Sequence, residues 1–168
     1  GAGQFTEITP SPTCWIFNQY GGVHGNETLL TAIRDSCNYY FYEVGYRLAG
    51  GRTAGGYNVE KGLAVLEKYA RMFGLGEKSG LEISEYDPQI SDEDAVRSAI
   101  GQGTNAFSLS HIGRYVAALA NRGSVYNLTL LDRVESADGE TVESFEPELY
   151  NQVEIADSSW DAVQQGMM

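Results

Sequence analysis

The sequence predicts an α+β fold that is mostly helical and carries one small β-hairpin. Three segments, 26–48, 58–76 and 108–123, repeat apolar residues at the helical period. A fourth segment, 126–147, has strand-forming residues on both sides of Asp138-Gly139, a dipeptide that favours hairpin turns. The chain has 168 residues, of which 42% are hydrophobic. It is therefore long enough for one domain with a core, or for a large part of a bigger domain.

The N-terminal part divides into an extended entry and a helical region. Residues 1–25 are expected to be extended and rich in turns, because their two prolines disfavour a helix. A short strand is predicted there at 14–17. The helical region of 26–123 begins at a capping residue, which is Asn26 or Thr28.

Glycines and caps delimit the helices that follow. The helix of 58–76 is predicted to stop at Gly74 or Gly76, since glycine is common just after a helix C-terminus. The helix of 108–123 begins at Ser108 as N-cap and stops at Gly123. The predicted apolar positions of these two helices are Leu63, Leu66, Tyr69, Ala70 and Phe73 in the first, and Ile112, Val116 and Leu119 in the second.

The remaining part of the chain is predicted to be mixed. Residues 99–107 form a glycine-rich turn before the helix at 108. Residues 124–157 are assigned to the β-hairpin and a loop. Residues 158–168 are assigned to the start of a final helix, within which the sequence ends.

Charge and composition exclude several classes of function. The formal net charge is −12, from 11 basic and 23 acidic residues. Such a chain is repelled by phosphate backbones, so no nucleic-acid partner is expected. No apolar run reaches about 18 residues, so no membrane-spanning segment is predicted. No cofactor motif is found, and Gly101-Gln102-Gly103 lacks the Lys-Ser/Thr ending of a phosphate loop.

The cysteines and histidines do not indicate a site by themselves. Cys14 and Cys37 are too few for a disulfide framework, and their spacing from the histidines is not that of a zinc motif, so no metal is predicted. The two cysteines either form one disulfide bond or are small core residues that do not pair. His24 and His111 are assigned structural roles, because no nucleophile elbow accompanies them.

Three small polar residues, Ser36, Cys37 and Asn38, interrupt an otherwise apolar helical segment. An aromatic run, expected to be core, follows at 39–42. One interpretation is an ordinary helix junction in which Ser36 ends one helix and caps the next. The other is a catalytic corner whose partners come from elsewhere.

Four segments, taken in order, carry a resemblance to a known family. They read "HGNETLLTAIRDSCNYYFYEVGYRLA", "YARMFGLGEKSGLEISE", "AIGQGTNAFSLSHIGRYVAALANRG" and "WDAVQQGMM". Together they resemble the transpeptidase domain of class B penicillin-binding proteins, and the resemblance covers nearly the whole chain. It implies the helical part of the fold that these proteins share with serine β-lactamases.

The active site of that family uses three motifs, of which this sequence contains one. Ser36-Cys37-Asn38 matches the Ser-x-Asn motif. No serine is followed three positions later by lysine, so the Ser-x-x-Lys motif with the nucleophile is absent. Lys78-Ser79-Gly80 spells the third motif, Lys-Thr/Ser-Gly, but it lies in a glycine-bounded loop and is not assigned to the active-site strand. The chain is therefore expected to be an internal fragment of such a domain, and to be inactive alone.

The resemblance implies acyl transfer through a serine ester, with peptidoglycan stem peptides as substrates and β-lactams as inhibitors. Ser36 would relay a proton, since a hydroxyl both donates and accepts. Asn38 would offer its amide to the substrate, and Cys37 would point into the core. The parent protein is expected at the bacterial membrane with this domain outside the cytoplasm, and the chain itself is expected to be soluble.

Two other functions stay open at this point. One is a non-catalytic extracytoplasmic interaction or sensor module that keeps the helical half of the fold. The other is a relative of the serine β-lactamases that hydrolyses its acyl-enzyme. Self-association through apolar faces is also expected, because large exposed apolar patches are uncommon on stable monomers.

Overall fold

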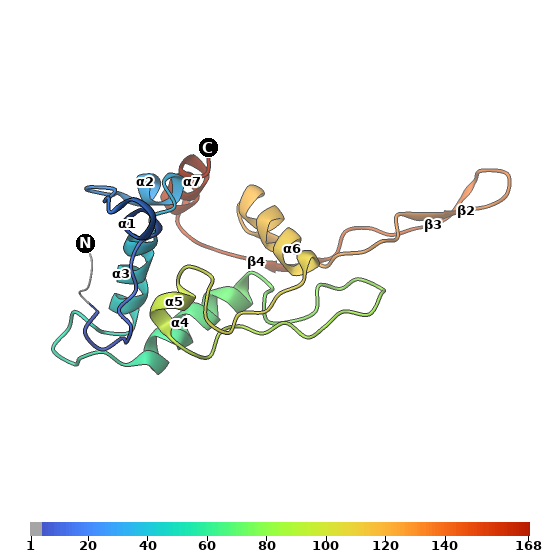
Figure 1. The fold of residues 1–168 in the computed structure, drawn as a ribbon. Helices are drawn as coiled ribbons and strands as arrows, with labels where there is room; N and C mark the ends of the chain where they lie inside the picture. Colours follow the sequence, from blue (N-terminus) through green and yellow to red (C-terminus); the bar gives the residue numbers. More distant parts are fainter. Residues whose placement is uncertain (1–4) are drawn as a thin grey trace. The chain divides into compact units, whose positions relative to one another are not determined.

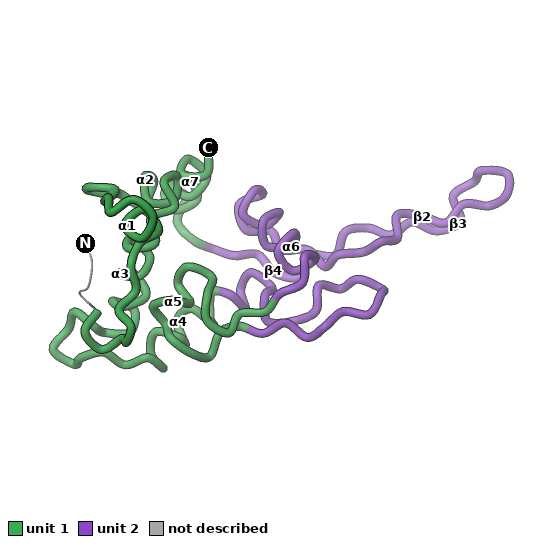
Figure 2. Tube along the Cα trace, viewed as in Figure 1, with its two compact units in different colours: residues 1–69, 90–106, 155–168 green, residues 70–89, 107–154 purple. Residues whose placement is uncertain are grey.

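A computed structural model describes residues 5–168 and divides the chain into two compact units (Figure 2). Unit 1 comprises residues 1–69, 90–106 and 155–168. Unit 2 comprises residues 70–89 and 107–154. The mostly helical α+β fold class is confirmed, with seven helices and four short strands in the described part of the chain (Figure 1).

Unit 1 is helical. It contains α1 (Trp15–Tyr20), α2 (Leu29–Arg34), α3 (Asn38–Leu48), α5 (Ala95–Ser98) and α7 (Asp157–Gly166), together with most of α4 (Val59–Met72). No helix in the described residues combines the length and the hydropathy that a membrane crossing needs.

The strand predicted at 14–17 is wrong, because helix α1 occupies this position. The Cys14 carbonyl accepts hydrogen bonds from the backbone N–H groups of Phe17 and Asn18, which starts the helix. Gly21, with a φ of 65°, ends it in the left-handed conformation that glycine adopts without steric cost. The prolines lie ahead of the helix and so do not oppose it.

The core of unit 1 is largely aromatic and is organised by α3. Tyr42 and Tyr46 of this helix are buried against Phe5 and Val96, and the rings of Phe5 and Tyr46 lie 5.3 Å apart edge to face. Such pairs contribute beyond the area that they bury. The burial of Tyr42 confirms that part of the 39–42 run is core. The core thereby fixes the helix whose first residue is Asn38.

Unit 2 combines one helix with two antiparallel strand pairs. Helix α6 (Leu109–Ala120) is capped by Ser108, whose hydroxyl accepts from the backbone N–H of His111, as predicted. Strand β2 (Arg133–Glu135) pairs with β3 (Thr141–Ser144), and Gly139 at a φ of 84° lies in the turn, which confirms the hairpin. The second pair, β1 (Ser124–Tyr126) with β4 (Leu149–Gln152), was not predicted.

The predicted core stripe of α6 is wrong in two of its three positions. Ile112 and Val116 are exposed, whereas the buried side of the helix carries His111, Arg114 and Ala118. Polar partners explain this choice, because a buried charge needs compensation. Arg114 donates to the Lys78 carbonyl and to Asn127, and its guanidinium lies 4.3 Å from the Tyr150 ring centroid. Self-association through the exposed stripe stays a prediction.

A carboxylate, Glu85, ties the loop at 77–85 to the start of α6. It accepts from the Ser79 hydroxyl at 2.6 Å, from the Ser79 backbone N–H at 2.9 Å and from the Ser110 hydroxyl at 2.6 Å. Burial raises the pKa of Glu85, but these hydrogen bonds outweigh it and hold the pKa below its ordinary value.

We expect Glu85 to make unit 2 less stable in acid. Because the folded pKa is depressed, the stabilisation is full above the ordinary carboxyl pKa of about 4.3 and is lost as the pH falls through the lower folded value. Denaturant unfolding across this range should show a pH dependence that Glu85→Gln reduces. The control is Glu146→Gln, because Glu146 is exposed. If the free energy of unfolding of Glu85→Gln depends on pH as steeply as that of the parent chain, the assignment is wrong.

Candidate functional site

The Ser36–Asn38 segment forms the turn between α2 and α3. Ser36 has a φ of 50°, in the left-handed region that non-glycine residues rarely occupy. Its side chain is exposed, whereas Cys37 is 5% exposed and Asn38 is half-buried. The turn therefore presents Ser36 to solvent and directs Cys37 inward, as the sequence suggested for Cys37.

The alternative in which Ser36 caps α3 is wrong. The N-cap position belongs to Cys37, and the helix begins there with no side-chain capping hydrogen bond. A left-handed serine costs of order 1–3 kcal/mol, and such strain is concentrated at functional sites. Asp94 and Arg122 also have positive φ values, so this conformation marks Ser36 as a candidate and the catalytic corner stays a prediction.

Trp15 holds this turn and was not anticipated from the sequence. Its indole N–H donates to the Ser36 carbonyl at 2.9 Å. The backbone N–H of Ser36 donates to the Ile33 carbonyl at 3.2 Å, and that of Cys37 donates to the Ala32 carbonyl at 2.9 Å. Three hydrogen bonds thus fix the peptide planes on both sides of Ser36. An aromatic residue 21 positions upstream gives no local signal of this role.

Asn38 occupies the first position of α3, above the buried Tyr42 one turn later. Burial raises the pKa of the Tyr42 hydroxyl, and a hydrogen bond from the Asn38 side chain acts in the opposite direction.

A cavity of about 480 Å³ lies beside α3, and neither Ser36 nor Asn38 lines it. Its walls include Glu27, Cys37, Tyr40 and Arg47, and one carboxylate oxygen of Glu27 is buried without a hydrogen-bond partner among the described residues. The exposed face of the turn is therefore separate from this cavity.

The other sequence candidates are structural. Lys78-Ser79-Gly80 lies in a loop and not in a strand, and Ser79 is fully buried with its hydroxyl donated to Glu85. His111 is buried in α6 and contacts the Glu77 carbonyl through Nε2 at 3.0 Å.

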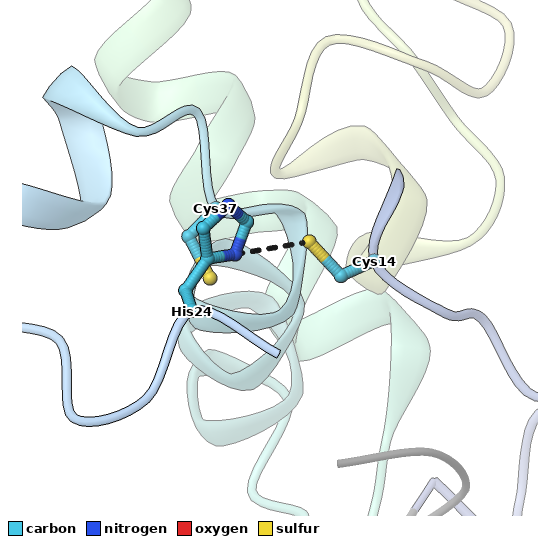
Figure 3. Close-up of side chains that lie close together, drawn as sticks. All are labelled: Cys14, His24 and Cys37. Carbon is cyan, nitrogen blue, oxygen red and sulfur yellow. Dashed lines mark hydrogen bonds between the residues drawn. The ribbon is translucent and has the colours of Figure 1, made fainter. Parts of the chain in front are cut away.

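His24 lies beside both cysteines, which its expected structural role did not anticipate (Figure 3). Cys14 and Cys37 are free thiols, so the bridge considered for them is not formed in this structure. One ligand atom from each of the three side chains lies within 4.8 Å of the others. The sequence separations of 10 and 13 residues match no zinc motif, so only the fold reveals this cluster.

Comparison with known proteins gives consistent matches. The model of the penicillin-binding protein transpeptidase domain matches residues 6–168. The peptidoglycan D,D-transpeptidase MrdA of Haemophilus influenzae is 26% identical over 160 residues, which cover 86% of this chain and 22% of that protein. This chain thus spans about a fifth of the relative's length.

Solved structures show the same fold. Penicillin-binding protein 2B of Streptococcus pneumoniae matches with a TM-score of 0.71 and 22% identity, over 83% of this chain and 25% of the other. Penicillin-binding protein A of M. tuberculosis, in an imipenem acyl-enzyme complex, matches with a TM-score of 0.66 and 19% identity, over 88% of this chain and 33% of the other. The family model alone spans nearly every residue, and on that ground the chain belongs to the penicillin-binding protein transpeptidase domain family.

Proposed function

We propose that this chain forms the Ser-x-Asn wall of a peptidoglycan D,D-transpeptidase active site, with Ser36 and Asn38 as its acting residues. The observation that carries the proposal is the turn at Ser36, in which this residue is exposed and left-handed and its carbonyl accepts a hydrogen bond from the Trp15 indole. The similarity to a D,D-transpeptidase supports the reaction class. The whole protein is proposed to work outside the cytoplasm, anchored to the membrane, where its polymeric substrate lies.

The proposed reaction is acyl transfer between stem peptides. A serine of a Ser-x-x-Lys motif, outside these 168 residues, attacks the carbonyl between two terminal D-alanines, and the terminal D-alanine leaves. An amine of a second stem peptide then attacks the ester and releases the serine. Backbone N–H groups near the nucleophile stabilise the oxyanion in both steps.

Ser36 and Asn38 have separate tasks in this scheme. The Ser36 hydroxyl accepts a proton from the nucleophile side and donates one toward the leaving nitrogen, which a single hydroxyl can do through its donor and two acceptor sites. The Asn38 amide hydrogen-bonds the peptide carbonyl of the donor strand and aligns it. A β-lactam follows the same path and stops at the acyl-enzyme, as the imipenem complex of the M. tuberculosis relative illustrates for that protein.

Fluorescent penicillin tests the proposal. On the intact protein that contains these residues, we expect one covalent adduct on the serine of its Ser-x-x-Lys motif, and on residues 1–168 alone we expect none. Intact-mass analysis with peptide mapping gives the position. A stoichiometric adduct on Ser36 or on any other serine of this chain would overturn the assignment of roles.

Two results would favour the other functions. An intact protein with no adduct at all indicates the non-catalytic module. Rapid loss of the adduct in water, without an acceptor amine, indicates the β-lactamase relative. A stable adduct that is transferred to an added amine supports the transpeptidase.

A further inference from the structure

Three side chains that the proposed reaction does not use converge behind the Ser36 turn (Figure 3). Cys14 precedes α1, His24 lies in the segment between α1 and α2, and Cys37 is the N-cap of α3. All three belong to unit 1. The Cys14 Sγ and the His24 Nδ1 are 3.6 Å apart, and the ligand atoms of all three lie within 4.8 Å of one another.

These separations fit a tetrahedral metal site. Zinc bonds of about 2.3 Å to sulfur and about 2.0–2.1 Å to nitrogen place neighbouring ligand atoms roughly 3.5–3.8 Å apart. The 3.6 Å between the Cys14 sulfur and the His24 nitrogen matches such a separation between two ligand atoms. A disulfide would instead need the two sulfurs about 2.05 Å apart, and both thiols are free.

The surroundings leave the ligands available to an ion. Cys14 is 7% and Cys37 is 5% exposed, so little water competes with the ion for them. The His24 Nε2 is buried with no hydrogen-bond partner in the described part of the chain, so the only hydrogen bond of the ring in that part is the one between its Nδ1 and the Cys14 Sγ, within the cluster itself. The Trp15 ring lies 5.5 Å from the imidazole and limits its other motions.

A cavity of about 50 Å³ is lined by all three side chains. A single water needs roughly 10–15 Å³ of such space, so this cavity has room for an ion and one further ligand. Two thiolates also balance the charge of a divalent ion, which removes most of the cost of burying it. The donor set of two sulfurs and one imidazole nitrogen selects zinc over magnesium or calcium, which prefer oxygen ligands.

We propose that Cys14, His24 and Cys37 bind one Zn²⁺ ion, with a water as the fourth ligand. The ion would join the start of α1 and the segment before α2 to the residue between Ser36 and Asn38. It would therefore act as a structural clamp on the turn and not as a reacting centre. The inference stands on these three side chains and does not depend on the proposed acyl transfer.

Metal analysis of the full chain tests the site. The chain is purified with a non-thiol reductant and no chelator, and its zinc content is measured. Cobalt is then substituted for zinc, because thiolate-to-cobalt charge-transfer absorption reports sulfur ligands directly. We expect one equivalent of zinc, a cobalt spectrum with two thiolates, and a melting temperature that rises when zinc is added back to the metal-free chain. Cys14→Ser, His24→Ala and Cys37→Ser should each weaken zinc binding at least about 100-fold.

The control is Lys61→Ala, which changes an exposed residue of α4 that belongs to the same unit and does not line the cavity, and it should bind zinc as the parent chain does. If a cysteine variant fails to fold, the cobalt spectrum of the parent chain decides the matter. Absence of stoichiometric zinc, a cobalt spectrum without charge transfer, or zinc binding unaffected by Cys14→Ser would each overturn the proposal. A Cys14–Cys37 disulfide in the protein isolated without reductant, found as a mass lower by two hydrogen atoms, would also overturn it.

Discussion

Replacing Asn38 by alanine is expected to slow acylation of the intact transpeptidase by a β-lactam about 100-fold. In the proposed role, the Asn38 amide is the partner of a substrate carbonyl that is buried on binding. A buried polar group without its partner costs about 1–3 kcal/mol, and the upper part of this range corresponds to a factor of about 100 in rate. The fold should persist, because the side chain is half-buried and the core below it is built by Tyr42 and Tyr46.

The second-order rate of acylation by fluorescent penicillin measures this effect, with thermal unfolding as the check on folding. Asn26→Ala is the matched control, since Asn26 is an exposed asparagine in the same unit and precedes α2. It should leave the rate unchanged. If Asn38→Ala acylates as fast as the parent protein, Asn38 has no role in aligning the substrate.

The elements that the sequence predicted well are those set by local chemistry. Thr28 caps α2 through a hydrogen bond from the Thr31 backbone N–H, and Ser108 caps α6 in the same way. Gly74 and Gly139 adopt positive φ values where a helix stop and a hairpin turn were expected. Each of these choices depends on residues within a few positions, which a single sequence displays.

Elements that depend on distant contacts were missed. Helix α5 is only four residues long, and its N-cap residue Asp94 has a positive φ, which no sequence pattern predicts. The buried face of α6 is set by the hydrogen bonds of Arg114 to residues of other segments. The hydrophobic period alone therefore predicted the wrong face of this helix. The β1–β4 pair joins residues more than twenty positions apart. Tertiary contacts decided each of these features.

The candidate site shows the same division. Ser36 and Asn38 were found because their motif is contiguous, and Cys37 was placed inward by its position between them. Trp15 and His24 reach the turn from other segments, and only the fold brings them there. The catalytic roles of Ser36 and Asn38 remain predictions, because those roles need partners beyond this chain.

Replacing Gly45 by alanine is expected to destabilise unit 1 by about 3 kcal/mol. Gly45 lies where α3 crosses α5, and an added Cβ would meet the Ala95 carbonyl oxygen at 2.5 Å and the Ala99 Cβ at 2.9 Å. The Val96 Cα would lie at 3.0 Å. Backbone atoms cannot turn aside as a flexible side chain can, so the two helices must separate. Overpacking of this kind costs typically 1–3 kcal/mol, occasionally more, and it exceeds the gain in helix propensity from glycine to alanine.

Gly113→Ala is the matched control for this substitution. Gly113 lies inside α6, and its added Cβ would meet nothing within 4 Å, so the same change should stabilise that helix by roughly 0.5–1 kcal/mol. In thermal unfolding, Gly45→Ala should melt roughly 5–10 °C below the parent chain, and Gly113→Ala at or above it. Because α3 begins at Asn38, its displacement should also loosen the Ser36 turn, visible as faster amide hydrogen exchange there. If both variants melt alike, α3 and α5 do not touch through Gly45, and the core that orients Asn38 is built differently.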